Sequence, residues 1–356
     1  MTAPRARSGA RRPRLLLLSM YPLDRGIWGA TARITHLRDE LSTLVDLDVV
    51  ADVRAARALA LGRYATSGRQ RGLAGIYVEP STGLPGPADV AFLGLAKALG
   101  IPVLTYFRDA QPLFDEYYRG GSLKARLSRA RFLPAFRALG AVSTRIAYPS
   151  VGLAEAFGDV GDPLLLPPGS PAPVDVPRSP DARQLLFVGG MRYPVHGWEI
   201  LVEAIERVRR DGIDVGLVLV SRPGEEPPAP RPAWARVERG SGERIHRLLP
   251  DVLATVQPRR RSPYNDLAVP IKVLEYLSYG RPILATDATE QARLLREAGA
   301  GIVVPDTADG LVDGIHRLVS ATPEQLDDWS EAARVAAKRH SWHARAAHVL
   351  EILQAS

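Results

Sequence analysis

Two runs of apolar residues constrain the fold of this chain more than any other feature. RLLLLSM (14–20) and DVGLVLVSR (214–222) are almost unbroken by polar residues over the length of a β-strand. A strand with one face in water alternates apolar and polar residues, whereas a strand covered on both faces does not. The runs therefore predict strands of parallel sheets with helices on both sides. Because one run lies in each half of the chain, we expect two α/β units.

Size and composition agree with two units. A chain of 356 residues has the length of about two domains, and 46% of its residues are hydrophobic. Cysteine is absent, which excludes disulfides, thiolate nucleophiles and cysteine zinc sites. The net charge of +7 favours an anionic partner. No apolar run approaches the roughly 18–20 residues of a membrane span, and LLLL is too short for a signal peptide, so we expect a cytoplasmic protein.

The stretch PIKVLEYLSYGRPILATD (270–287) carries the strongest functional signal. It predicts a helix that opens at Pro270 and ends at Gly280, followed by a strand. Lys272 and Glu275 are three residues apart, so they share a face near the N-terminus of this helix. Unpaired N–H groups, the helix dipole and a lysine suit a diphosphate. A carboxylate one turn deeper could accept hydrogen bonds from ribose hydroxyls, so the pattern fits a nucleoside diphosphate.

This stretch resembles the donor-site helix of GT-B glycosyltransferases, and most closely that of glycosyltransferase group 1, or family four. The matching residues are Pro270, Lys272, Glu275, Tyr276, Gly280, Arg281, Pro282 and Ile283. In that family the glutamate binds the donor ribose and the lysine binds the diphosphate, which implies these roles for Glu275 and Lys272. The resemblance also implies the fold: α/β, with two Rossmann-like domains facing each other across a cleft.

The resemblance sets the expected domains. They are a disordered basic N-terminus (1–13), a Rossmann-like acceptor domain (14–165), a proline-rich linker (166–183), a Rossmann-like nucleotide-sugar donor domain (184–335) and a terminal helix that crosses back to the first domain (336–356). HSWHARAAHVLEIL (340–353) is similar to the terminal helix of the family.

The second half departs from the family pattern at several positions. The arginine usual after the first strand falls at Gly190, and the usual lysine falls at His196. Arg192 is the nearest replacement cation. The family often has a second glutamate eight residues before Glu275, and this chain has Leu267 at that position. Asn265 or Asp266 could take over part of the role of the missing glutamate. The implied donor-site residues are Gly189, Gly190, Arg192, Asn265, Ile271, Lys272 and Glu275.

In the first half, the candidates are polar or glycine residues that follow predicted strands. Arg108 and Asp109 end the strand at 102–109, at the edge where open α/β sheets bind ligands. In the family a histidine near this point contacts the donor sugar. Asp109 could deprotonate an acceptor hydroxyl, or the two residues could simply form a salt bridge. Trp28 and Gly29 lie in the first loop, which in the family lines the cleft. We therefore expect Lys272, Asp109 and Arg192 to be catalytic.

Residues 119–145 form a basic segment without acidic residues, in which leucines and phenylalanines alternate with arginines. Such a segment can lie on an anionic membrane surface. We expect Pro134 to break the helix of this segment. It lacks the reading motifs of nucleic-acid binders, and we expect no nucleic-acid partner. The protein would then be peripheral at the inner face of the membrane.

Asp46 and Asp48 form a D-x-D pair like the metal motif of another glycosyltransferase fold. Because the pair lies inside a predicted strand, we expect no metal site there, and no cofactor beyond the nucleotide-sugar co-substrate.

The predicted function is transfer of a sugar, of the hexosyltransferase type, from a nucleoside diphosphate sugar to an acceptor hydroxyl. The acceptor is a glycan, a lipid-linked molecule or a small molecule. Family membership implies retention of configuration without a metal. Two alternatives remain: a nucleotide-sugar epimerase of the same fold, and a basic binding protein that lost its chemistry.

Overall fold

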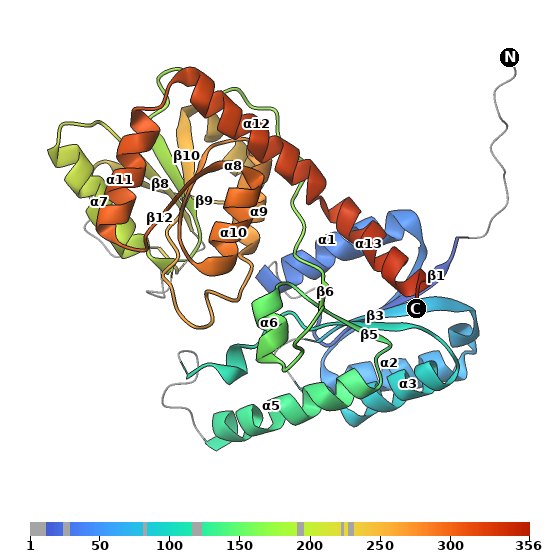
Figure 1. The fold of residues 1–356 in the computed structure, drawn as a ribbon. Coiled ribbons are helices and arrows are strands. Elements are labelled where there is room, and N and C mark those ends of the chain that lie inside the picture. Colours follow the sequence, from blue (N-terminus) through green and yellow to red (C-terminus); the bar gives the residue numbers. More distant parts are fainter. Residues whose placement is uncertain are drawn as a thin grey trace, which may run out of the picture. The chain divides into compact units, whose positions relative to one another are not determined.

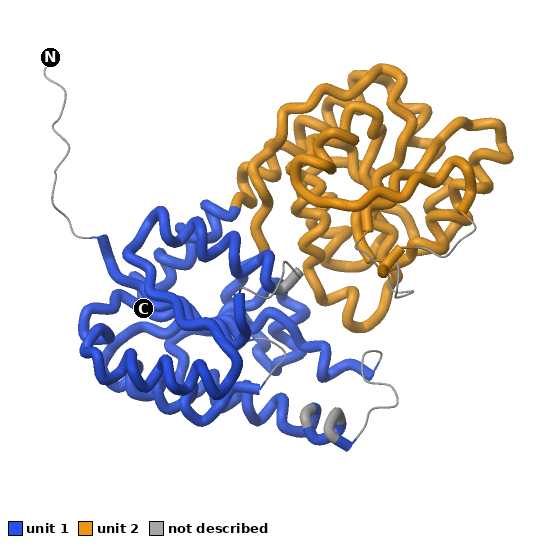
Figure 2. The backbone as a smooth tube through the Cα atoms, turned by 180° about the vertical axis from the view of Figure 1, so that it is seen from behind, with its two compact units in different colours: residues 1–167, 342–356 blue, residues 168–341 orange. Residues whose placement is uncertain are grey.

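The structure of the chain is a computed structural model, and it describes residues 12–23, 29–80, 84–115, 123–190, 196–221, 224–226 and 231–356. The chain divides into two compact units. Unit 1 comprises residues 1–167 and 342–356, and unit 2 comprises residues 168–341 (Figure 2). Each unit contains one six-stranded sheet whose paired strands are all parallel, as the apolar runs predict.

The sheet of unit 1 has the strand order β2-β1-β3-β4-β5-β6. Its strands are β1 (Arg14–Ser19), β2 (Asp46–Ala51), β3 (Leu73–Glu79), β4 (Val103–Tyr106), β5 (Arg145–Tyr148) and β6 (Leu164–Leu165). Its helices are α1 (Gly29–Leu44), α2 (Arg54–Thr66), α3 (Pro87–Ala98), α5 (Leu123–Ala141), α6 (Val151–Ala156) and α13 (Trp342–Gln354), with 3₁₀ turns η1 (Arg69–Gly72) and η2 (Gln111–Leu113) (Figure 1).

Strand β1 shows why its sequence is continuously apolar. Leu16 and Leu18 pack in a core with residues of α2, α3 and α5, while Leu15 and Leu17 pack in a second core with residues of α1 and α13. Because successive side chains point to opposite faces, a strand covered on both faces needs apolar residues at every position.

Unit 2 has the strand order β12-β11-β10-β7-β8-β9. Its strands are β7 (Gln184–Val188), β8 (Gly216–Ser221), β9 (Ala235–Arg239), β10 (Val252–Gln257), β11 (Ile283–Thr286) and β12 (Gly301–Val304). Its helices are α7 (Trp198–Arg210), α8 (Glu243–His246), α9 (Ile271–Ser278), α10 (Thr289–Ala298), α11 (Ala308–Val319) and α12 (Pro323–Arg339), with the 3₁₀ turn η4 (Leu249–Asp251).

The core of unit 2 follows the same rule as that of unit 1. Leu185 and Phe187 of β7 pack with residues of α7 and α11, whereas Leu186 and Val188 pack with residues of α8, α9, α10 and α12. Helix α9 is therefore held on one face of the sheet, with its N-terminus beyond the end of β10.

The expected break at Pro134 is wrong, because α5 continues through Pro134 from Leu123 to Ala141. Pro134 is exposed, while Phe132 and Phe136 on the opposite side are buried in the core of unit 1. An interior proline removes one helical hydrogen bond and costs about 3 kcal/mol. Burial of the two aromatic rings, at roughly 1.5–3 kcal/mol each, offsets that cost.

The segment predicted as a linker packs onto unit 2 from Pro168 onward. Ser170 donates from its hydroxyl to the Leu274 carbonyl (2.7 Å), and the Val174 N–H donates to the Ser278 carbonyl (2.8 Å). The Arg281 side chain, 2% exposed, donates to the carbonyls of Val176, Pro177, Leu249, Val252 and Gly280. One guanidinium thus attaches this segment to the core of unit 2.

The units meet in sequence at Pro167/Pro168, whereas we placed the first domain's end at 165 and the linker at 166–183. The chain returns to unit 1 at Trp342 rather than at 336, because α12 continues to Arg339 within unit 2. In unit 1 the Trp342 ring stacks on His36 of α1, with centroids 5.5 Å apart.

Candidate functional site

Helix α9 has the boundaries that its sequence predicts. Pro270 precedes the first helical residue, Ile271, and Gly280 follows the end of the helix with φ = 57°. A side chain there would be strained, and an added Cβ would lie 2.8 Å from Nη1 of Arg334. Glycine therefore ends the helix and turns the chain into β11.

Lys272 and Glu275 lie together, as their spacing predicts. Nζ of Lys272 is 2.6 Å from Oε2 of Glu275. The second carboxylate oxygen, Oε1, accepts a 2.6 Å hydrogen bond from the hydroxyl of Tyr279. The Lys272 and Glu275 side chains remain 38% and 22% exposed. This ion pair is therefore accessible and contributes roughly 1 kcal/mol or less to stability.

Tyr279 was not predicted as a site residue. It is 3% exposed, and its ring edge contacts the ring of His246 in α8 (centroids 6.1 Å apart). Burial, then the charge and hydrogen bond of Glu275, raise the pKa of Tyr279 far above its usual value. Its hydroxyl therefore stays protonated and acts as a donor that orients Glu275. An aromatic residue four positions after the glutamate was the available sequence signal.

Tyr276 anchors the same helix to β7. The Val188 N–H donates to the Tyr276 hydroxyl over 2.8 Å. This contact places α9 beside the end of β7, directly before Gly189 and Gly190.

The loop between β10 and α9 is held by Asn265. Its side chain is 1% exposed, accepts from Arg259 Nη2 (2.6 Å) and donates to the Arg260 carbonyl (2.7 Å). The predicted donor-binding residue Asn265 thus has both ends of its amide engaged within the loop, and it fixes the position of Arg259.

Gly190 and His196, the two departures from the family pattern, lie near Glu225 and Arg259. A Cβ on Gly190 would lie 2.4 Å from Oε2 of Glu225, so Glu225 occupies the space of a side chain there. Burial lowers the pKa of His196 most, and the positive charge of Arg259 lowers it further, while the charge of Glu225 raises it. Arg259 is thus a cation near the usual basic positions that sequence reasoning missed. The proposed replacement, Arg192, lies outside the described residues.

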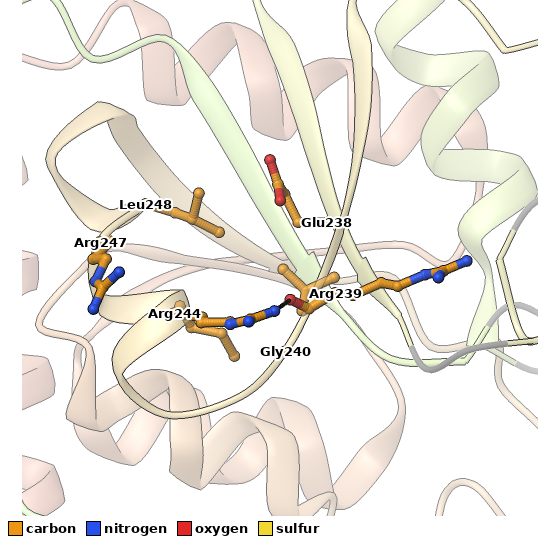
Figure 3. A pocket seen from close by; sticks show the side chains of 8 residues that line it. Glu238, Arg239, Gly240, Arg244, Arg247 and Leu248 are labelled. Atoms are coloured by element: carbon orange, nitrogen blue, oxygen red, sulfur yellow. Dashed lines mark hydrogen bonds between the residues drawn. The ribbon is translucent and has the colours of Figure 1, made fainter.

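A cavity of about 360 Å³ lies at the carboxyl end of β9. It is lined by Val220, Glu238, Arg239, Gly240, Arg244, Ile245, Arg247 and Leu248. Figure 3 shows Arg244 reaching toward the Arg239 backbone, whose carbonyl accepts its hydrogen bond (3.5 Å), while the Arg239 guanidinium points away from α8. The cavity shares α8 with His246, which contacts Tyr279.

In unit 1, Arg108 and Asp109 follow β4 as predicted, but they do not pair with each other. Nη1 of Arg108 lies 3.7 Å from Oε1 of Glu79, at the end of β3. Oδ1 of Asp109 accepts the Gln111 N–H (3.0 Å). Gly29 is the first residue of α1, and Trp28 lies outside the described residues.

The D-x-D residues serve the edge of the sheet in unit 1. Asp46 pairs with Arg14, and Asp48 accepts from the Tyr64 hydroxyl (2.7 Å). In the part of the chain that the structure describes, no cluster of three or more His, Asp or Glu residues suits a metal ion.

Comparison with solved structures defines the class of fold. The chain is similar to HepE of Anabaena in complex with UDP and glucose (14% identity, 96% of this chain and 99% of that one, TM-score 0.63). It is also similar to sucrose-phosphate synthase from Thermosynechococcus elongatus (14%, 96% and 98%, 0.64). A third is a trehalose-phosphate synthase from Burkholderia xenovorans with glucose-6-phosphate (11%, 96% and 100%, 0.60). The protein has the GT-B fold.

Sequence comparison then matches part of the chain, within unit 2, to a known family. Residues 182–321 match the family described as Glycosyl transferases group 1. No curated protein sequence matches the chain. The resemblance drawn from residues 270–283 is thus confirmed: unit 2 carries a group 1 glycosyltransferase domain, and the enzyme is of the glycosyltransferase class.

Proposed function

We propose that the protein transfers a sugar from a uridine diphosphate sugar to an acceptor hydroxyl. The observation that carries this proposal is the arrangement of Lys272 and Glu275 on α9 with Tyr279, the residue directly after this helix. A cation and an oriented carboxylate lie together near the N-terminus of this helix. The similar HepE structures are complexes with UDP and glucose and with UDP-glucose, which supports uridine as the base.

Donor binding exchanges the partners of the Lys272–Glu275 ion pair. The Glu275 carboxylate, fixed through Oε1 by Tyr279, accepts hydrogen bonds from the ribose hydroxyls. Lys272 turns to the diphosphate, where the α9 N–H groups add their dipole. Since the pair is accessible and weak, this exchange costs little.

The leaving diphosphate gains negative charge as the glycosidic bond breaks. Lys272 and Arg259 would stabilise that charge, the role first assigned to Lys272 and Arg192. Asn265 holds Arg259 in position by its 2.6 Å hydrogen bond. With these cations, transfer needs no metal or cofactor, and we propose retention of configuration as in the family. Asp109 remains the proposed base for the acceptor.

The cavity beside α8 is proposed to hold the uracil end of the donor. A volume of about 360 Å³ suits a small ligand portion. Helix α8, which lines this cavity, contacts Tyr279 through His246, and Tyr279 in turn donates a hydrogen bond to Glu275. A ribose bound at Glu275 would therefore place the base toward α8.

An anionic membrane surface is the proposed second partner, through α5. Leu123 and Leu127, 80% and 47% exposed, lie on the solvent side of this helix. Arg126, Arg131 and Arg137 are exposed beside them, and α5 contains no acidic residue. Leucines flanked by arginines suit insertion between anionic headgroups. No helix among the described residues is long and apolar enough to cross a membrane.

The test is calorimetric titration with UDP together with hydrolysis of UDP-sugars. We expect Lys272→Ala to lower kcat by about 10²-fold, as for loss of one preorganised charge. Glu275→Ala should mainly weaken UDP binding. Lys338→Ala, at an exposed lysine of the same unit, is the matched control. Wild-type turnover in Lys272→Ala, or interconversion of donors without acceptor, would refute the proposal.

A further inference from the structure

Arg108 is held at the point in unit 1 where an open α/β sheet binds its ligand. The chain leaves β1 for β2 on one side, and β3 pairs with β1 on the other, so the strand order reverses between β1 and β3. Ser19 and Glu79, the last residues of these strands, are register partners. Ligands of such sheets bind outside the carboxyl ends of the strands at this switch point. Arg108 follows the neighbouring strand, β4.

The carboxylate of Glu79 is already satisfied by other residues. Its Oε2 atom accepts from Arg33 and from the Tyr77 hydroxyl (3.1 Å), and its Oε1 atom accepts from the Tyr21 hydroxyl (2.9 Å). Glu79 is fully buried and Arg33 is 2% exposed. This pair is a closed structural unit whose charge Arg33 neutralises.

Arg108 is a second cation near that carboxylate; its guanidinium lies over the Tyr21 ring (5.7 Å to the centroid), and among the described residues only its Nη1 atom makes a hydrogen bond. Nη1 donates to the Tyr21 hydroxyl (3.4 Å) and lies 3.7 Å from Glu79. The Nε and Nη2 atoms make no hydrogen bond to any described residue.

The two nitrogens without a hydrogen bond to a described residue, Nε and Nη2, are the pair that binds oxyanions. The Nε–H and one Nη2–H point the same way and match two oxygens of a phosphate or carboxylate. The Arg108 side chain is only 14% exposed, so little of this interaction would be lost to competing water. Tyr21, Glu79 and Asp109 raise the pKa of Arg108 against the effect of burial, so it remains charged.

We propose that the Nε/Nη2 edge of Arg108 binds an oxyanion group, phosphate or carboxylate, of the acceptor. This inference rests on the proposed function, for which it narrows the acceptor to an anionic molecule. Glu79 and Tyr21 are positioning residues, because they hold Nη1 and thereby orient the opposite edge.

The experiment is calorimetric titration of the full chain with glucose 6-phosphate, glucuronate, glucose and a short-chain phosphatidic acid. Each titration is run with and without saturating UDP, so that anions bound at the diphosphate site are recognised. We expect at least one anionic probe to bind in the presence of UDP and glucose not to bind. The sugar anions and the lipid phosphate distinguish a soluble acceptor from a lipid-linked one.

Variants assign the binding to Arg108. Arg108→Gln should lower affinity for the bound probe by about 10-fold or more, as for loss of a charge-assisted bidentate contact. Arg108→Lys keeps the charge and supports folding, but it lacks the fork and should lose most of the same affinity. Arg63→Gln, at an exposed arginine of α2, should bind as wild type. UDP affinity should stay within about twofold in all three.

Equal binding by Arg108→Gln and the wild type, or no binding of any anionic probe beyond that of glucose, would overturn the inference. If UDP still binds in either case, the donor function of unit 2 stands. Failure of UDP to bind the wild type would instead remove the proposed function, whatever Arg108 does.

Discussion

Tyr279→Phe tests whether the donor carboxylate depends on a buried hydroxyl. The substitution removes one oxygen and keeps the ring, which is 3% exposed and contacts His246. The lost hydrogen bond, 2.6 Å to Oε1 of Glu275, is one to a charged group, for which about 1.5–3 kcal/mol is typical. Because Glu275 is 22% exposed, water replaces part of it. We expect a net loss of about 1 kcal/mol in UDP binding, or roughly fivefold in Kd.

The assay is calorimetry with UDP in a double-mutant cycle of Tyr279→Phe and Glu275→Ala. If Tyr279 acts through Glu275, its substitution should change Kd only while Glu275 is present. Tyr64→Phe is the matched control, since it removes a tyrosine hydroxyl that also bonds to a carboxylate, Asp48, but in unit 1. An equal effect of Tyr279→Phe in both backgrounds, or an equal loss of UDP affinity in Tyr64→Phe, would refute the reasoning.

Three further predictions concern other parts of the molecule. Arg281→Lys should destabilise the protein by about 3 kcal/mol in urea unfolding, since a lysine cannot reach all the carbonyls that Arg281 binds; a loss below about 1 kcal/mol would contradict this. Leu123→Ser with Leu127→Ser should reduce sedimentation with phosphatidylglycerol vesicles, whereas Leu59→Ser, at an exposed leucine of α2, should not; equal sedimentation of all variants would exclude docking through α5. Because the pKa of His196 is lowered in the folded state, the unfolded state binds more protons just below pH 6.5. The free energy of unfolding should therefore decrease as the pH is lowered through this range, and His196→Asn should flatten that slope in urea titrations. An unchanged slope would show that other groups cause it.

Much of the donor side could be predicted from local sequence. The period of a helix places Lys272 and Glu275 on one face wherever the helix lies, and Pro270 and Gly280 mark its ends through backbone geometry alone. Reasoning from local sequence gave the wrong result at Pro134, where it predicted a break in the helix. A rule about one hydrogen bond cannot include the burial of Phe132 and Phe136, which keeps α5 continuous.

The contact partners of individual side chains could not be predicted from local sequence. A salt bridge between Arg108 and Asp109 was one of two alternatives that the sequence left open, and the structure places Arg108 against Glu79 instead. Arg259 lies near His196 although sixty-odd residues separate them, and Glu225 fills the space beside Gly190. These contacts depend on which strands are adjacent in the sheet, and single-sequence patterns do not encode that order.

The sequence by itself predicted two α/β units from runs of apolar residues, and residues 270–283 carried the resemblance to group 1 glycosyltransferases that the match over residues 182–321 supports. The predicted strands and the predicted helix follow from the two- and 3.6-residue periods of the backbone, which operate over short stretches. Only the tertiary structure decided which oxygen of Glu275 accepts the hydrogen bond of Tyr279, and which nitrogen of the Arg108 guanidinium contacts Tyr21 and Glu79. Those outcomes depend on side chains that meet across strands and helices, where burial and hydrogen-bond geometry select one partner among several.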